Sequence, residues 1–187
     1  MDKPPRLNII FDSRRQEKYD PLVEEMTRQR ISYEIWPCLM FDEIPQSINA
    51  SHKMIVRDAK DRGLVEVVIA EDDVCFPNEK GWEWFLKNKP PVYDIYCAGN
   101  YLPFDKPGRE GSFRVESVVG FHCYFVHSRY YDTFLNTPDK EHIDTAQKSK
   151  LMYVCYPMAA IQRSGWSANN KSVVDYNSIL KKEDIYQ

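Results

Sequence analysis

An apolar, β-branched run, Leu64-Val65-Glu66-Val67-Val68-Ile69-Ala70, leads directly into Glu71-Asp72-Asp73. Such a run is typical of a strand that is buried on both faces of a parallel sheet covered by helices. Parallel sheets bind ligands beyond the carboxyl ends of their strands, which is where the three acids lie. The sequence therefore predicts a site for a hard divalent cation and a phosphate-bearing substrate at this end of the strand.

Outward from this strand, the chain alternates strand-like and helix-like segments. We expect strands at residues 7–11, 31–36, 92–97 and 151–156, one or two strands within 113–127, and helices at 16–30, 48–62 with Ser47 as the cap, 81–86, 128–135 and 139–148. This order predicts an α/β fold with a mostly parallel sheet flanked by helices. The length of 187 residues predicts a single compact domain, residues 1–187, with a polar C-terminal tail from about residue 157.

Composition excludes several classes of partner. The net charge is −3 with the two signs interspersed, so no basic stripe supports binding to nucleic acid or to an anionic membrane. No apolar run approaches the ~20 residues of a transmembrane segment, and the N-terminus lacks the apolar region of a signal peptide. Five widely spaced cysteines without a C-x-x-C pair predict free thiols in a reducing compartment. We expect a cytoplasmic protein.

The three acids carry the main chemical hypothesis. Adjacent carboxylates repel each other and raise each other's pKa unless a cation neutralises them. Mg²⁺ or Mn²⁺ does so with one or two protein oxygens, and diphosphate oxygens and water complete its coordination. The alternative is a solvated acidic turn that is paired with lysine or arginine side chains.

A motif pattern then connects the acids with the rest of the chain. Ser51-His52 on a helix is followed by Ala59, Gly63, the apolar strand and Glu71-Asp72-Asp73-Val74. Further matching positions are Asn8-Ile9-Ile10 before Arg14-Arg15, Gly120 to Val126, Asp144, Gln162 and Ser167. In order and spacing these resemble the family 25 glycosyltransferases, the group of lipopolysaccharide-type and collagen galactosyltransferases.

The resemblance implies a GT-A fold with a Rossmann-type sheet and a Mn²⁺ or Mg²⁺ ion held by Glu71, Asp72 and Asp73. It implies an inverting hexosyltransferase that moves a sugar, commonly galactose, from a UDP-sugar donor to a hydroxyl of a glycan, lipid-linked or protein-linked acceptor. Asp144 is the candidate base that removes the proton from this hydroxyl. The candidate donor-binding residues are Arg14, Arg15, Ser51, His52, Glu71, Asp72, Asn100, Gln162 and Ser167.

Other interpretations stay open at this stage. The chain could be a non-catalytic nucleotide-sugar-binding or interaction module with the same fold. A phosphohydrolase is disfavoured because Glu71-Asp72-Asp73 lacks the companions that such chemistry needs. His52 could be a packed histidine, the two arginines could be solvated, and Asn100, in a predicted long loop from Asn100 to Gly111, could serve loop packing.

Overall fold

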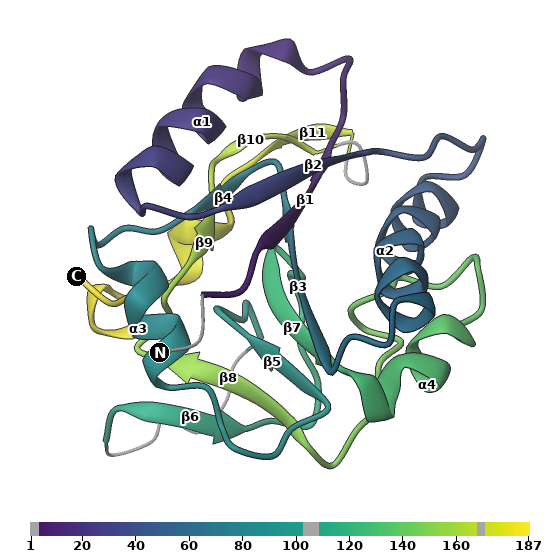
Figure 1. Ribbon diagram of the computed structural model, residues 1–187. Helices are drawn as coiled ribbons and strands as arrows, with labels where there is room; N and C mark the ends of the chain where they lie inside the picture. Colours follow the sequence, from purple (N-terminus) through teal and green to yellow (C-terminus); the bar gives the residue numbers. More distant parts are fainter. Residues whose placement is uncertain (1–3, 103–108, 168–170) are drawn as a thin grey trace.

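A computed structural model describes residues 4–102, 109–167 and 171–187 of the chain. Within these ranges, seven strands form the central sheet in the order β2-β1-β3-β7-β5-β8-β6 (Figure 1). Their bounds are Tyr33–Pro37 for β2, Leu7–Phe11 for β1, Glu66–Glu71 for β3, Cys123–His127 for β7, Ile95–Cys97 for β5, Met152–Tyr156 for β8 and Gly111–Arg114 for β6. β2, β1, β3, β5 and β8 run in one direction, and β7 and β6 run against them. The predicted mostly parallel α/β sheet is confirmed.

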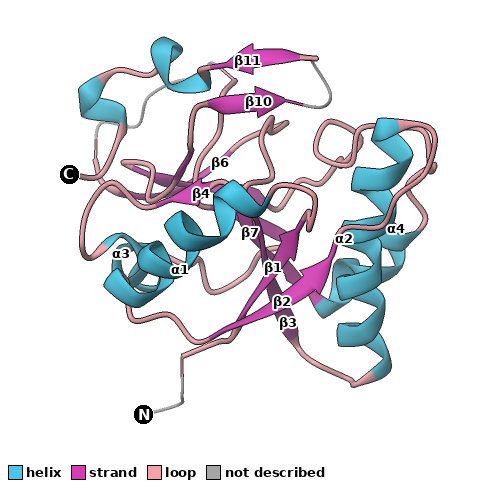
Figure 2. Ribbon diagram, turned by 90° about the horizontal axis from the view of Figure 1, so that it is seen from above, coloured by secondary structure: helices cyan, strands magenta, loops and turns pink. Residues whose placement is uncertain are grey.

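Helices cover both faces of this sheet. α1 (Tyr19–Arg28) and α3 (Gly81–Lys87) pack on one face, and α2 (Ile44–Asp61) and α4 (Tyr131–Leu135) pack on the other (Figures 1 and 2). A single layered domain results. The predicted helices at 81–86 and 128–135 correspond to α3 and to α4 with the 3-10 turn before it, and helix 16–30 to α1 with the 3-10 turn Gln16–Lys18.

The apolar strand is buried on both faces, as its sequence predicts. Val68 and Ala70 of β3 belong to the core under α1 and α3, whereas Val67 and Ile69 belong to the core under α2 and α4. Successive side chains of a strand point to opposite faces, so a continuous apolar run fills two cores at once. This double burial fixes the position of the residues that follow β3.

Two helix predictions are wrong in detail, and both errors arise around α2. The helix begins at Ile44. The Ser47 hydroxyl donates hydrogen bonds to the carbonyl oxygens of Glu43 and Phe41 and does not cap the N-terminus of the helix. The predicted helix at 139–148 is absent, and this segment contains short turns at residues 139–140 and 143–146. A side chain of α2 provides hydrogen bonds to backbone carbonyl groups of this segment, because Asn49 Nδ2 donates to the carbonyl oxygens of Pro138 and Glu141.

The described residues of the predicted polar tail include strands of two small sheets that are separate from the central sheet. β9 (Ile161–Gln162) pairs with β4 (Val74–Cys75), and β10 (Gly165–Ser167) pairs with β11 (Ser172–Val174). Two 3-10 turns follow, Tyr176–Ile179 and Lys182–Asp184. The β4–β9 pair brings Gln162, one of the predicted donor-binding residues, beside the acids at the end of β3.

Three other expectations concern the chain as a whole. All five cysteines are free thiols, as predicted. No described helix has the length and apolar character needed to cross a membrane. The predicted loop from Asn100 to Gly111 includes residues 103–108, which lie outside the described residues.

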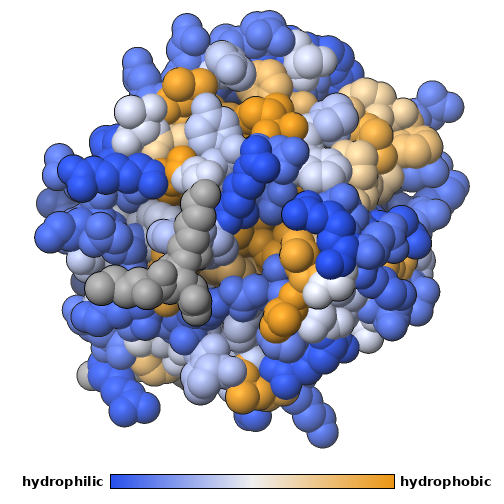
Figure 3. All heavy atoms as spheres, in the orientation of Figure 1, coloured by the Kyte–Doolittle hydropathy of each residue, from blue (hydrophilic) through white to orange (hydrophobic). Residues whose placement is uncertain are grey.

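The face seen in Figure 3 carries mainly hydrophilic side chains, with hydrophobic ones in separate small groups.

Phe125, in the middle of β7, is fully buried and packs against Phe85, with 5.4 Å between the ring centroids. Phe125→Ala should therefore lower the free energy of unfolding by about 3–5 kcal/mol, because it leaves a cavity in the central sheet. Urea denaturation measures this loss. Val173→Ala is the control, since Val173 is 76% exposed and its truncation should change stability by no more than about 0.5 kcal/mol. Similar losses in the two variants would contradict the packing described.

Candidate functional site

A pocket of about 870 Å³ lies beyond the carboxyl ends of β1, β2 and β3. Asp12 follows β1, Cys38 follows β2, and Glu71, Asp72 and Asp73 stand at the end of β3. α2 contributes Ser51 and His52, and the β10–β11 hairpin contributes Trp166, Ser167 and Val174. The acids therefore line a cavity at the position that the apolar strand predicts.

Asp72 and Asp73 form the turn between β3 and β4, and they share one lysine. Lys18 Nζ lies 2.5 Å from Asp72 Oδ1 and 3.3 Å from Asp73 Oδ2. Asp72 Oδ2 accepts the backbone N–H of Asp12 at 3.2 Å, so both of its oxygens have donors. Asp73 Oδ1 is buried and has no hydrogen-bond partner within the described part of the chain. One acceptor of this turn is thus left for a ligand.

The charges of this turn are incompletely neutralised. Burial raises the pKa of the Asp72 carboxyl, and the Lys18 ammonium offsets that rise only in part. Burial raises the pKa of Asp73 as well, and repulsion from Glu71 adds to the rise. Their charged forms are therefore less favourable in the folded protein than in water.

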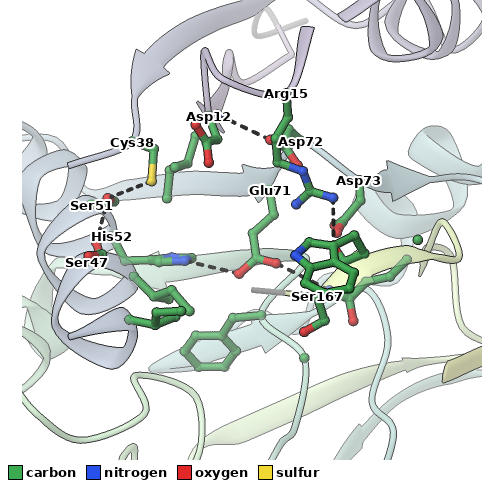
Figure 4. A pocket seen from close by; sticks show the side chains of 18 of the residues that line it. Asp12, Arg15, Cys38, Ser47, Ser51, His52, Glu71, Asp72, Asp73 and Ser167 are labelled. Carbon is green, nitrogen blue, oxygen red and sulfur yellow. Dashed lines mark hydrogen bonds and ion pairs between the residues drawn. The ribbon is translucent and has the colours of Figure 1, made fainter. Parts of the chain in front are cut away.

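Glu71 faces another part of the pocket. Its Oε1 lies 3.3 Å from His52 Nε2, and its Oε2 accepts from Gln162 Nε2 at 3.3 Å. His52 Nδ1 is in turn 2.6 Å from the Tyr124 hydroxyl. Figure 4 shows Glu71 pointing toward His52, whereas Asp72 turns toward Asp12. In the part of the chain that the structure covers, no three His, Cys, Asp or Glu side chains gather as a metal site. The three carboxylates do not converge as the three predicted ligands of one ion.

Arg14 and Arg15 both line the pocket, with different partners. The Arg14 guanidinium binds both carboxylate oxygens of Asp12, at 2.8 and 2.5 Å, and is largely exposed. This pairing holds the pKa of Asp12 below its usual range. Arg15 donates to the carbonyl oxygen of Trp166 at 2.8 Å and so ties the loop after β1 to β10.

The other predicted donor-binding residues differ in how they reach the pocket. The buried Ser51 hydroxyl donates to the Ser47 carbonyl oxygen and accepts the Leu39 N–H, so it joins α2 to the loop after β2. Gln162 and Ser167 line the pocket directly. Asn100 is not among the lining residues, and its Oδ1 accepts two backbone N–H groups behind the pocket wall.

Asp144, the predicted base, lines the same pocket from a turn after α4. Its Oδ2 accepts the Gly120 N–H at 2.9 Å, and its Oδ1 accepts the Thr145 N–H at 2.7 Å. Gly120 has φ +95°, and a Cβ atom there would lie 2.8 Å from the Tyr101 ring. The glycine thus permits the backbone approach that orients Asp144.

Lys18 and Trp166 are pocket residues that were not predicted. Lys18 gives no sequence signal of its own, because it stands among other charged residues of a helical segment. Trp166 is 55% exposed at the pocket wall. Its position beside the predicted Ser167 is a signal in the sequence, since aromatic side chains favour ligand contact. Tyr101 also lines the pocket, and its hydroxyl accepts the Gln162 N–H.

Comparisons with known proteins give a fold and no family. No family model matches the chain, and no curated protein matches it. The structure of A197 from STIV is similar, with a TM-score of 0.51 and 15% identity over 91% of this chain and 93% of that one. At this identity the likeness shows a shared fold alone.

Two glycosyltransferase structures are less similar to this chain. One is a glycosyltransferase involved in glycosylation of the major capsid of PBCV-1, with a TM-score of 0.44 and 14% identity over 69% of this chain and 63% of that one. The other is a mutant Drosophila β-1,4-galactosyltransferase 7 in complex with manganese, UDP-Gal and xylobiose, with a TM-score of 0.42 and 16% identity over 70% of this chain and 52% of that one. The chain spans less than two thirds of the length of either protein.

Asp73→Asn should stabilise the metal-free protein at neutral pH, because it removes a charge that burial and Glu71 disfavour. A rise in melting temperature on the order of 2–4 °C is expected in EDTA. A carboxyl whose folded-state pKa is raised costs stability above that pKa, so the gain should shrink as the pH falls toward 3.8, the unfolded value. Thermal melts from pH 7 to 4 check this.

Asp139→Asn is the matched control, since Lys53 holds the pKa of the exposed Asp139 below its usual value. It should not raise the melting temperature. A destabilised Asp73→Asn protein at pH 7 would contradict the electrostatic description of the turn.

Proposed function

We propose that this protein is a metal-dependent glycosyltransferase that transfers a hexose, such as galactose, from a UDP sugar to a hydroxyl of a glycan or glycoconjugate, lipid-linked or protein-linked. The observation that carries the proposal is the buried Asp73 Oδ1, which has no hydrogen-bond partner among the described residues and lies in an acidic turn at the end of the central strand. The resemblance of the sequence motifs to those of family 25 glycosyltransferases supports the proposal. The mostly parallel central sheet supports it as well, because a GT-A fold contains such a sheet. The free thiols fit the cytoplasm as the proposed location.

The residues of the turn fit a Mn²⁺ or Mg²⁺ ion. Hard divalent cations in phosphate sites use one or two carboxylates and take their other ligands from phosphate and water, so a three-residue cluster is not required. Asp73 Oδ1 has no hydrogen-bond partner among the described residues, and the Asp72 and Asp73 carboxylates share one ammonium group. Asp73 and Asp72 are the proposed ligands, with Glu71 nearby. When bound, the ion would stabilise the charge that develops on the departing diphosphate.

The donor is proposed to lie along the side of the pocket formed by the first loop and the β10–β11 hairpin. Arg15 and Arg14 supply guanidinium donors for an anionic nucleotide, and Gln162 and Ser167 supply polar groups from the C-terminal segment. Ser51 and His52 shape the opposite wall from α2. Asn100 supports the pocket wall from behind, so its proposed role in donor binding becomes an indirect one.

Asp144 is the proposed base. Two backbone N–H groups fix its carboxylate at the pocket wall, and each oxygen retains a further acceptor position for an acceptor hydroxyl. Asp144 would take the proton from this hydroxyl while the hydroxyl oxygen attacks the anomeric carbon, and the bond between this carbon and the diphosphate oxygen would break to release UDP. Such a single displacement inverts the configuration at that carbon, and a positioned base contributes about 10²–10⁴ in rate.

The same two hydrogen bonds favour a second candidate, a non-catalytic nucleotide-sugar-binding module. A carboxylate that accepts two backbone N–H groups could serve only to hold its turn against Gly120. In that case the pocket would bind the donor without transferring the sugar. The two candidates differ in turnover and agree in donor binding.

Donor binding is tested by thermal shift with UDP sugars, with and without Mn²⁺. We expect UDP-galactose to raise the melting temperature when Mn²⁺ is present and to have a much smaller effect in EDTA. Adenosine diphosphate sugars serve as the comparison for the base. No shift with any nucleotide sugar, at any metal concentration, would rule out both candidates.

Catalysis is tested with Asp144→Asn, which keeps the size of the side chain and one carbonyl acceptor. Transfer, or slow hydrolysis of the UDP sugar, should fall by about 10²-fold or more while the dissociation constant for the donor stays the same. Asp139→Asn is the control in the same segment. Unchanged turnover in Asp144→Asn would remove Asp144 from the role of base, and a wild-type protein that binds the donor without any turnover would favour the binding module.

A further inference from the structure

Lys18 occupies the place between the two aspartates that the proposed ion would need. It stands in the 3-10 turn Gln16–Lys18, which follows the loop after β1, and its side chain is only 15% exposed. Its ammonium contacts Asp72 Oδ1 and Asp73 Oδ2. Lys18 also lines the pocket, so it contacts the acidic turn and is accessible to a ligand as well.

A divalent ion held by Asp72 and Asp73 would lie close to the Lys18 ammonium, which contacts both carboxylates. At such short separations the like charges of the ion and the ammonium repel each other. Lys18 therefore has to leave the aspartates when an ion binds there. A lysine side chain suits such a movement because its ammonium sits on a flexible four-carbon stem and makes no bidentate contact.

The surroundings of Lys18 are fixed, which confines the movement to the side chain. The Lys18 backbone N–H donates to the Arg15 carbonyl oxygen at 3.0 Å, and Arg15 is itself bonded to Trp166. On the other side, the Asp12 N–H holds Asp72 Oδ2 in place at 3.2 Å. Asp72 thus keeps its orientation after Lys18 departs, and the freed ammonium remains in the pocket.

We propose that Lys18 neutralises the acidic turn when no ligand is bound. When the divalent ion binds, the Lys18 ammonium leaves the two aspartates and pairs with the diphosphate of the nucleotide. This inference rests on the proposed function and adds to it a residue with two successive partners. In the ligand-free protein Lys18 reduces repulsion between Asp72 and Asp73. In the loaded protein its positive charge binds the phosphate oxygens.

Two opposite effects follow from the exchange. Lys18 competes with the ion when no nucleotide is present, so its removal should tighten metal binding. Lys18 assists nucleotide binding once the ion is in place, so its removal should weaken binding of uridine diphosphate. A lysine with only a structural role would not change the two affinities in opposite directions.

The test is calorimetric titration of the full chain and of Lys18→Met, first with MnCl₂ alone and then with uridine diphosphate at saturating Mn²⁺. Charged hydrogen bonds of this kind correspond to about tenfold in affinity or more. We expect Lys18→Met to bind Mn²⁺ about tenfold more tightly and uridine diphosphate about tenfold more weakly than the wild type. Lys60→Met, which removes an exposed ion pair with Asp132 outside the pocket, should leave both affinities unchanged.

Unchanged or weaker Mn²⁺ binding by Lys18→Met would overturn the proposal, as would unchanged binding of uridine diphosphate. Lys18→Gln, which keeps a polar group on a shorter stem, should shift both affinities in the same directions and replaces the methionine variant if that protein does not fold. Failure of the proposed function is distinguishable, since it would appear as a wild-type protein that binds Mn²⁺ but neither transfers nor binds a UDP sugar. The effect of Lys18 on Mn²⁺ alone would still be measured.

Discussion

The site depends on an imbalance of charge at the end of one buried strand. Glu71, Asp72 and Asp73 follow β3, and Lys18 is the ammonium group that contacts the two aspartates. The strand cannot shift to relieve this repulsion, because its side chains are packed into cores on both faces. Hydrophobic packing thus holds the aspartates at a buried position where their charged forms are disfavoured. Negative charge at the base of the pocket is therefore incompletely neutralised.

Hydrogen bonds from the surrounding elements orient the three carboxylates. The Asp12 N–H orients Asp72, while His52 and Gln162 hold Glu71 toward another wall. The result is a divided acidic site, with two aspartates that share a lysine and a glutamate in a separate hydrogen-bond network. A divided site suits a ligand that brings its own oxygens, such as a metal-bound diphosphate, better than it suits a metal bound by protein groups alone.

The sequence predicts what depends on local pattern. The apolar run up to Ala70 specifies a doubly buried strand, and it places the acids that follow at the ligand-binding edge of the sheet. The position of Lys18 depends on how the turn after β1 packs against the turn after β3, so no local pattern contains it. The predicted start of α2 is wrong because the Ser47 hydroxyl donates to the carbonyl oxygens of Phe41 and Glu43 and does not cap the helix, which begins at Ile44. The role of residue 162 depends on pairing between β4 and β9, which are far apart in the chain.

The proposed function requires that a divalent ion join Asp72 and Asp73 to a nucleotide diphosphate. Anomalous diffraction at the manganese absorption edge, from crystals grown with Mn²⁺ and UDP, tests this requirement. We expect one anomalous peak at about 2.0–2.2 Å from an oxygen of Asp73 and from the diphosphate, with the Lys18 ammonium turned away from the aspartates. A crystal with UDP bound, no manganese at the turn and Lys18 still paired with both aspartates would contradict it.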